Sequence, residues 1–171
     1  MANFLAEWRE KMAAKTNRGF AAFREGKAIY FAFINKHGEN YGCGQNDSTL
    51  PRAYALYQEA EQIALQEERF HDVASTHAEL GKICELQGRY TDSIAHRKKA
   101  IELFETMPNL NNLDNETVRD SYMFLALSYF HCGKKNEAKE TAKVAIEKYR
   151  AAKDPYGIGR LEQMLKDMET T

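Results

Sequence analysis

Histidine and carboxylate side chains between residues 71 and 77 are the first candidates for chemistry in this chain. His71, Asp72 and His77 fall within one predicted helix, and histidine with carboxylate is a common ligand set for zinc. An α-helix places side chains six positions apart about 240° from each other around its axis, so the two histidines face different sides. We therefore expect these histidines to pack between helices, and we predict no metal site.

The cysteines offer a second kind of chemistry, because a thiolate can act as a nucleophile. Cys84 follows His77 by seven positions and shares a helical face with it, but both lie where helices are expected to pack. His131 and Cys132 have no third group to orient them, and Cys43 lies in a glycine-rich loop with nothing nearby to lower its pKa. Three cysteines without a CxxC pair indicate reduced thiols. We expect no catalytic residue and no cofactor.

An internal repeat supplies the elements that position these side chains. Two stretches match without a gap at an offset of 45 residues, with Leu80, Gly81, Gly88, Ser93 and Ala100 in the first and Leu125, Ala126, Gly133, Ala138 and Ala145 in the second. Small residues let two helices approach closely. Gly88 and Gly133 each follow an apolar run, where a helix commonly ends in a left-handed residue. Each copy is therefore predicted to be a helix, a turn and a helix.

The order of small residues and glycine within each copy resembles the tetratricopeptide (TPR) motif, a pair of antiparallel helices joined by a tight turn. The flanking segments extend the pattern with equal steps of 14 residues between copies, from Ala60 to Ala74 and from Ala145 to Gly159. Added to the 26 residues between the first and last small positions of one copy, this step gives a repeat of 40 residues. The resemblance implies an all-α solenoid whose first helices line a concave surface.

We predict a single TPR domain over residues 1–171, with three helix pairs, an N-terminal helix and a C-terminal capping helix. The N-terminal amphipathic helix, marked by the apolar residues Phe4, Leu5, Trp8 and Met12, is expected to end at a break near Thr16–Gly19. The other expected parts are a degenerate first repeat over 20–68 with a loop over 37–50, a second repeat over 74–106, a loop over 107–115, a third repeat over 119–152 and the capping helix over 155–168.

Charge and hydropathy narrow the classes of partner. The net charge of −1 and the isoelectric point near 6.5 argue against nucleic acid as a partner, and we expect the basic run Arg97–Lys98–Lys99 to be solvated. No apolar segment approaches the roughly 18 residues of a membrane helix, and charged residues stand where a signal peptide needs its apolar core. We expect a cytoplasmic protein that binds no membrane.

The resemblance also implies which residues face a partner in the groove. TPR proteins contact ligands mainly through fixed positions of the first helix of each repeat. Carried over to this chain, with two residues of the capping helix, the groove residues are Ser75, Ala78, Lys82, Glu85, Asp120, Met123, Leu127, Phe130, His131, Arg160 and Gln163. The basic clamp with which some members hold a chaperone's C-terminal carboxylate is not visible at these positions, so a chaperone adaptor is disfavoured.

The predicted groove helix over 121–130 is apolar on nearly every side, which requires that its inner face be covered. The N-terminal helix, a second copy of the chain, an amphipathic partner helix and the neighbouring repeats are four candidates. The predicted function is a non-enzymatic interaction module that binds a peptide or amphipathic helix in the groove, and a homodimer formed through the N-terminal helix is one form of partner. A peptide-sensing regulator and an enzyme built on a helical scaffold are the alternatives.

Overall fold

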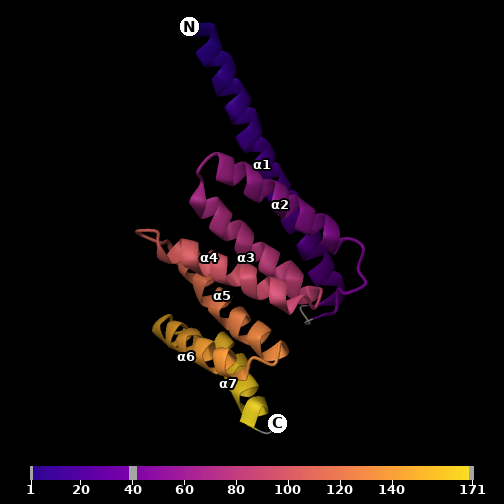
Figure 1. Cartoon of the computed structure of the whole chain (residues 1–171), viewed down its shortest axis with the longest axis vertical. Coiled ribbons are helices and arrows are strands. Elements are labelled where there is room, and N and C mark those ends of the chain that lie inside the picture. The colour runs from indigo at the N-terminus through magenta and orange to yellow at the C-terminus, as the bar shows by residue number, and fades with distance from the viewer. Residues whose placement is uncertain (1, 39–41, 170–171) are drawn as a thin grey trace.

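Seven α-helices follow one another through residues 2–38 and 42–169, the part of the chain that our computed structural model describes (Figure 1). They are α1 Ala2–His37, α2 Leu50–Gln66, α3 Phe70–Leu86, α4 Tyr90–Glu105, α5 Asn112–His131, α6 Lys135–Ala151 and α7 Tyr156–Glu169. No strand occurs within these ranges. The all-α fold class is confirmed. In the same ranges, no helix has both the length and the apolar character that crossing a lipid bilayer requires.

The helices pack in adjacent pairs. The most extensive contacts are between α1 and α2, between α3 and α4 and between α5 and α6, and each pair also packs on the next. α1 and α2 run antiparallel, because Arg18 pairs with Glu59 while Glu25 pairs with Arg52, further along α1 but earlier in α2. The final helix, α7, packs on α5 and α6.

Left-handed residues end the helices at the predicted turns. Gly88 and Gly133 have φ values of 72° and 71°, and in each turn the next amide donates to a carbonyl oxygen five residues earlier, at 2.8 and 2.9 Å. This is the hydrogen bond of a Schellman helix end. Glu68 and Lys153 adopt the same conformation after α2 and α6. The glycines therefore end their helices as predicted, and two non-glycine residues do the same elsewhere.

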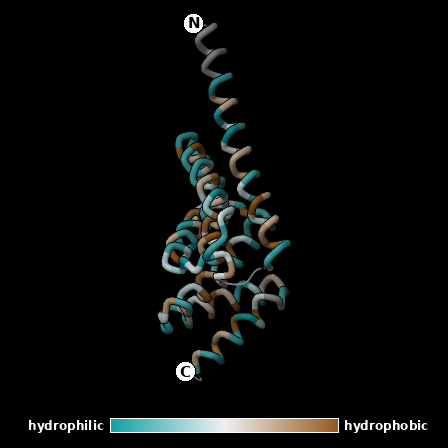
Figure 2. The backbone as a smooth tube through the Cα atoms, turned by 90° about the vertical axis from the view of Figure 1, so that its right-hand side faces the viewer, coloured by the Kyte–Doolittle hydropathy of each residue, from teal (hydrophilic) through white to brown (hydrophobic). Residues whose placement is uncertain are grey.

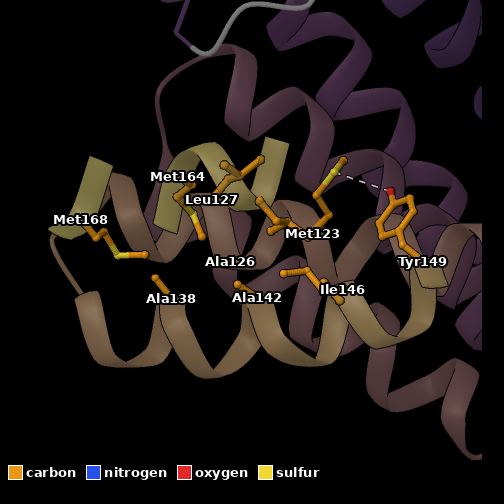
Figure 3. Packing of buried hydrophobic residues seen from close by; sticks show 11 residues of the cluster. Met123, Ala126, Leu127, Ala138, Ala142, Ile146, Tyr149, Met164 and Met168 are labelled. Atoms are coloured by element: carbon orange, nitrogen blue, oxygen red, sulfur yellow. Dashed lines mark hydrogen bonds between the residues drawn. The ribbon is translucent and has the colours of Figure 1, made fainter. Parts of the chain in front are cut away.

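The largest apolar core lies between α5, α6 and α7 (Figure 3). Ala138, Ala142 and Ala145 are fully buried along one face of α6, where their small side chains let α6 approach α5 closely. A second core joins α1, α2 and α3 and includes Phe33 and Leu50. Each core belongs to more than one helix pair, so the pairs stabilise one another.

The predicted break at Thr16–Gly19 is wrong, because α1 is one helix from Ala2 to His37. Glycine at position 19 serves close packing: a Cβ atom there would lie 3.0 Å from Cγ2 of Ile63. Gly26, two turns later, faces the ring of Tyr57 in the same way. The two glycines thus lie where α1 packs closely on α2. The predicted boundary between a helix over 1–15 and a repeat from residue 20 is not present, because α1 is continuous there.

The N-terminal half of α1 projects beyond the rest of the molecule (Figures 1 and 2). Within the described side chains, Thr16 Oγ1 of α1 donates to Oε1 of Glu67, the residue that follows α2, at 2.8 Å. The side chains of Phe4, Leu5 and Trp8, on which the predicted apolar stripe depends, lie outside the described side chains.

The third pair begins earlier than predicted. α5 starts at Asn112, inside the segment expected to be a loop up to residue 115 and before the expected repeat start at 119. Asn111 and Asp114 form a reciprocal capping box, with hydrogen bonds of 3.0 and 3.1 Å between each side chain and the other's amide. This cap satisfies amides at the helix start, so a sequence rich in Asn and Asp begins a helix here.

Candidate binding groove

A hollow of about 340 Å³ is lined mainly by α1, α3 and α5. Its lining consists of Gly19, Phe20, Phe23 and Lys27 from α1, Ala60 from α2, the cap residue Arg69 before α3, Asp72, Ser75, Thr76, Glu79 and Lys82 from α3, and Leu113, Glu116, Thr117 and Asp120 from α5. The residues of α3 recur every three or four positions, so one continuous face of that helix forms the floor.

Apolar side chains stand on both walls of this first hollow. Phe20 on α1 is 46% exposed and Leu113 on α5 is 69% exposed, which makes Leu113 the most exposed large apolar residue in the described part of the chain. Phe23 is partly buried and meets Tyr57 edge to face, with 5.4 Å between ring centroids. Exposed apolar side chains around a hollow are typical of a binding surface.

Charged side chains of both signs line the same hollow. Arg69 forms ion pairs with Glu67 and Asp72, and its guanidinium lies 4.8 Å from the ring centroid of Phe20. The Lys82 ammonium donates to Oε1 of Glu79 at 2.9 Å. These pairs fix the charged groups on the floor and beside the α1 wall.

A second hollow, of about 420 Å³, lies between α5 and α7. It is lined by Leu127, Phe130 and His131 from α5 and by Gly159, Arg160, Gln163, Met164 and Asp167 from α7. The ring of His131 stacks on that of Tyr90, with centroids 4.5 Å apart, and burial lowers the pKa of His131. α5 thus contributes its first half to one hollow and its last turns to the other.

Eight of the eleven predicted groove residues line these hollows. Ser75, Lys82 and Asp120 line the first, and Leu127, Phe130, His131, Arg160 and Gln163 line the second. Asp120 is held in place by the Tyr149 hydroxyl, which donates to its Oδ1 at 2.6 Å. The structure therefore divides the predicted set between two neighbouring places along α5.

The other three predicted groove residues are buried in the interior. Ala78 is buried, and Met123 lies in the core of α5, α6 and α7, where the Tyr149 hydroxyl donates to its sulfur at 3.6 Å (Figure 3). Glu85 is buried between α3 and α4. The face of α3 that meets the hollow follows positions 72, 75, 76, 79 and 82, and Ala78 and Glu85 lie to one side of it, about 100° and 120° from its centre.

The sequence analysis missed the wall residues Phe20 and Leu113 and the floor residue Glu79. A signal for Glu79 was present, because it lies four residues after Ser75 and three before Lys82 and so shares their helical face. Phe20 and Leu113 each lie three residues from another large apolar residue, Phe23 and Leu110, and nothing local shows which member of such a pair is exposed.

No protein-family model matches the chain, and the search of curated proteins finds none that is significantly similar.

The histidines belong to a hydrogen-bonded chain that joins α2, α3 and α4. Tyr54 Oη lies 3.0 Å from Nε2 of His96, Nδ1 of His96 lies 2.9 Å from Nδ1 of His77, and Nε2 of His77 lies 3.0 Å from Oε1 of Glu61. Burial and then the charge of His77 lower the pKa of His96 to about 4, and the bond from His77 lowers the pKa of Glu61. His77 is therefore engaged inside the helix stack.

The other candidates for chemistry are dispersed. His71 points to Asp114 of α5, with 2.8 Å between Nε2 and Oδ1, so it does not converge with His77. Burial raises the pKa of the Cys84 thiol to about 12, which keeps it protonated near neutral pH, while Cys43 is exposed. Within the described ranges, no group of three or more His, Cys, Asp or Glu side chains could hold a metal ion.

Arg97 overturns the expectation that the run Arg97–Lys98–Lys99 is solvated. It is buried and donates from Nε and Nη2 to the two carboxylate oxygens of Glu85, both at 2.9 Å. Its guanidinium also lies 4.7 Å from the ring centroid of Phe124. A Cβ atom at Gly81 would lie 2.8 Å from Nε of Arg97, so the small residue at this repeat position makes room for a buried ion pair.

The apolar helix over 121–130 is covered by its own chain. Leu125 packs with Ile94 and Ile101 of α4, and Leu127 packs with α6 and α7 in the largest core. α1 makes no backbone contact with α5 in the described ranges. Of the four candidates considered for covering this helix, the neighbouring helices account for most of its apolar surface, while Phe130 remains at the second hollow.

Proposed function

We propose that this chain is a TPR-like array that works as a non-enzymatic protein-interaction module, and that it binds a peptide or amphipathic helix of a partner protein along the two hollows. The observation that carries this proposal is which helices supply the residues that line the hollows. Apart from Ala60 and the cap residue Arg69, every residue that lines the two hollows belongs to α1, α3, α5 or α7.

The contacts between helices favour a stack that curves toward this surface. α1 contacts α3, α3 contacts α5, and α5 contacts α7. In contrast, no Cα atoms of α2, α4 and α6 lie within 8 Å of one another in the described ranges. A stack whose odd-numbered helices touch while its even-numbered helices are spread apart bends toward the odd-numbered side. Repeat proteins use a concave surface of this kind to bind partners.

The chemistry of the lining supports a peptide or helix as the bound partner. An amphipathic segment can place apolar anchors against Phe20, Leu113 and Phe130 while its polar groups meet the charged floor. The pair His77 and Cys84 is not available for catalysis, because His77 is bonded to Glu61 and His96, and Cys84 is buried. Both points favour binding over catalysis.

Selection from a displayed peptide library on the full-length protein tests the proposal, with fluorescence anisotropy to measure the affinity of the selected peptides. We expect Phe20→Ser or Leu113→Ser to weaken binding at least tenfold. Phe31→Ser and Leu65→Ser are matched controls, since these residues are 50% and 48% exposed but lie outside both hollows. Equal binding by groove and control variants would contradict the proposal.

A further inference from the structure

The hydrogen-bonded chain of Glu61, His77, His96 and Tyr54, called the histidine chain below, has a fixed direction of donation. The hydrogen bond from His77 lowers the pKa of Glu61, so this carboxylate is ionised near neutral pH and can only accept. Nε2 of His77, 3.0 Å from Oε1 of Glu61, therefore carries a proton and donates it. The other nitrogen of a neutral imidazole has no proton, so His77 Nδ1 is an acceptor.

The protonation of His96 follows from this acceptor. Nδ1 of His96 lies 2.9 Å from Nδ1 of His77, so the proton of this bond is on His96. Nε2 of a neutral His96 is then unprotonated and accepts from the Tyr54 hydroxyl at 3.0 Å. Burial raises the pKa of Tyr54, which keeps this hydroxyl protonated near neutral pH. Each group thus donates to the next, from Tyr54 to Glu61.

The histidine chain can bind one additional proton and keep all its bonds. With one histidine protonated, a single proton still lies between the two Nδ1 atoms, so one of them donates and the other accepts. His96 Nε2 now carries a proton and donates to Tyr54 Oη, because a hydroxyl oxygen can also accept. The negative charge of Glu61 stabilises the single positive charge. The first proton therefore reverses one bond and leaves the two rings in contact.

A second proton breaks the contact between the rings. When both histidines are protonated, each Nδ1 carries a hydrogen, and two donors 2.9 Å apart have no acceptor between them. Two like charges at this distance also repel each other. Burial, and then the charge of His77, lower the pKa of His96 to about 4, which agrees with a second proton that is difficult to add. The doubly protonated pair therefore requires that the rings separate.

The neighbouring charged groups leave the second positive charge without compensation. Arg89, which precedes α4, and Asp92 of α4 act on the charge of His96, but they form an ion pair with each other, with 2.6 Å between Nη2 and Oδ2. Burial raises the pKa of the nearby Cys84 thiol of α3 to about 12, so this thiol is neutral. The carboxylate of Glu61 on α2 acts on both histidines, and its one negative charge then meets two positive charges.

The histidine chain connects two helices whose backbones are apart. Tyr54 and Glu61 belong to α2 and His96 belongs to α4, and within the described ranges no Cα atom of α2 lies within 8 Å of one of α4. The rings of Tyr54 and His96 also meet edge to face, with centroids 5.9 Å apart. Apolar packing holds α2 to α1 and α3. Loss of the histidine contact therefore affects the spacing of α2 and α4 and leaves that apolar core in place.

We propose that the histidine chain is an acid-sensitive link between α2 and α4, which holds the two helices at their present spacing until both histidines are protonated and then lets them move apart. The protons come from solvent, which reaches the pair because the side chain of His77 is 13% exposed. This inference goes beyond the proposed function, since the change in spacing requires no partner.

Long-range proton–nitrogen NMR spectra of the histidine rings in the full-length protein test the direction of donation. At pH 7.5 we expect the proton of His77 on Nε2 and the proton of His96 on Nδ1. His77→Gln and His96→Gln assign the signals, because each variant lacks one ring. A proton on the other nitrogen of either ring would overturn the proposal.

The distance between spin labels on α2 and α4 tests the opening. Cys43→Ser and Cys132→Ser remove the accessible thiols, Cys84 is buried, and the labels are attached after the exposed-site changes Gln58→Cys and Lys98→Cys. We expect the mean label distance to increase by about 3 Å between pH 7.5 and pH 4, because a water molecule must enter between the two rings to accept their protons. Circular dichroism should show constant helicity over this range.

Variants in the labelled protein assign the opening to the histidine pair. In His96→Gln, which cannot take up the second proton, the label distance should stay constant with pH, and His77→Gln should behave in the same way. His71→Gln is the matched control, since His71 is bonded to Asp114 outside the histidine chain, and it should open as the parent does. A distance that is constant in the parent, that increases equally in folded His96→Gln, or that changes only as helicity is lost would overturn the proposal.

Discussion

At the scale of single residues, buried polar groups distinguish this helix stack from a purely apolar one. Arg97 and Glu85 form a buried ion pair, and Ser93 Oγ donates to Oε1 of Glu85 at 2.8 Å and lies 3.1 Å from Ser128 Oγ. The network connects α3, α4 and α5. Because each member supplies a partner that another member needs, removing one leaves a buried polar group unsatisfied.

We expect Arg97→Met to lower the free energy of unfolding by about 3–5 kcal/mol, because it leaves the Glu85 carboxylate buried without its countercharge. The double variant Arg97→Met with Glu85→Leu should recover much of that loss, since both charges are then gone. Urea denaturation of the three proteins measures the difference. A double variant that is less stable than the single variant would show that the pair itself contributes the stability.

The histidine chain predicts a dependence of stability on pH. The pKa of His96 is about 4 in the folded protein and 6.5 in an unperturbed histidine, so between these values the unfolded chain binds a proton that the folded chain does not. The free energy of unfolding should therefore fall as the pH falls from 6.5 to 4, by up to about 3 kcal/mol. The lowered pKa of Glu61 acts in the same direction at pH values below 4.5, the ordinary pKa of a glutamate side chain.

Urea denaturation at several pH values from 4 to 8 tests this dependence, with His96→Gln as the comparison. The variant should be less stable at pH 8, where it lacks the bond to His77, but its stability should change less between pH 6.5 and 4. Parallel profiles for the two proteins would assign the pH dependence to groups other than His96.

At the scale of elements, glycines set how closely the helices approach. Gly157 near the start of α7 is buried against Tyr149, and a Cβ atom there would lie 2.1 Å from the tyrosine ring. Gly159 lies in the same helix and has no atom within 4 Å of the corresponding position. The two glycines therefore have the same local propensity and different tertiary surroundings.

We expect Gly157→Ala to destabilise the protein by about 1–3 kcal/mol, because the buried Tyr149 ring must move and its hydroxyl is bonded to Asp120. Gly159→Ala should instead stabilise by about 0.5–1 kcal/mol, as expected for alanine replacing glycine inside a helix. Thermal unfolding of both variants measures the contrast. Shifts of the same sign would contradict this account of how α7 docks on α6.

At the scale of the whole molecule, the stack of helix pairs and the projecting part of α1 have different roles in stability. The cores join α1, α2 and α3 at one end and α5, α6 and α7 at the other. The N-terminal half of α1 extends beyond both (Figure 2). The stack should therefore fold without it.

We expect deletion of residues 2–15 to shift the unfolding midpoint by less than about 2 °C, because this segment projects beyond the helix stack and none of its described side chains, those of residues 10–15, is buried. A 1 kcal/mol change would correspond to about 2–4 °C for a chain of this size. Calorimetry measures the shift. Light scattering on the same proteins tests the expectation that this helix pairs two chains: a dimer that becomes a monomer on truncation supports it, and monomers in both cases contradict it.

The sequence by itself determined most of the helices, their pairing and the turns at Gly88 and Gly133, but not the continuity of α1 or the start of α5. Apolar periodicity and the left-handed preference of Gly88 and Gly133 depend on near neighbours in the chain, and they predicted the three helix pairs and the final helix. The small residues Ala100 and Ala145, predicted from the repeat to lie at close helix contacts, are both fully buried.

Only the tertiary structure decided which face of each helix meets the two hollows. Ser75 and Ala78 are three positions apart on α3, yet one lines the first hollow and the other is buried, because neighbouring helices cover one side of α3 and leave the other open. Gly19 was mistaken for a break because its packing partner, Ile63, is distant in sequence. Arg97 was predicted to be exposed because the carboxylate that neutralises it comes from another helix. Contacts between distant residues set these outcomes, and local patterns carry no information about them.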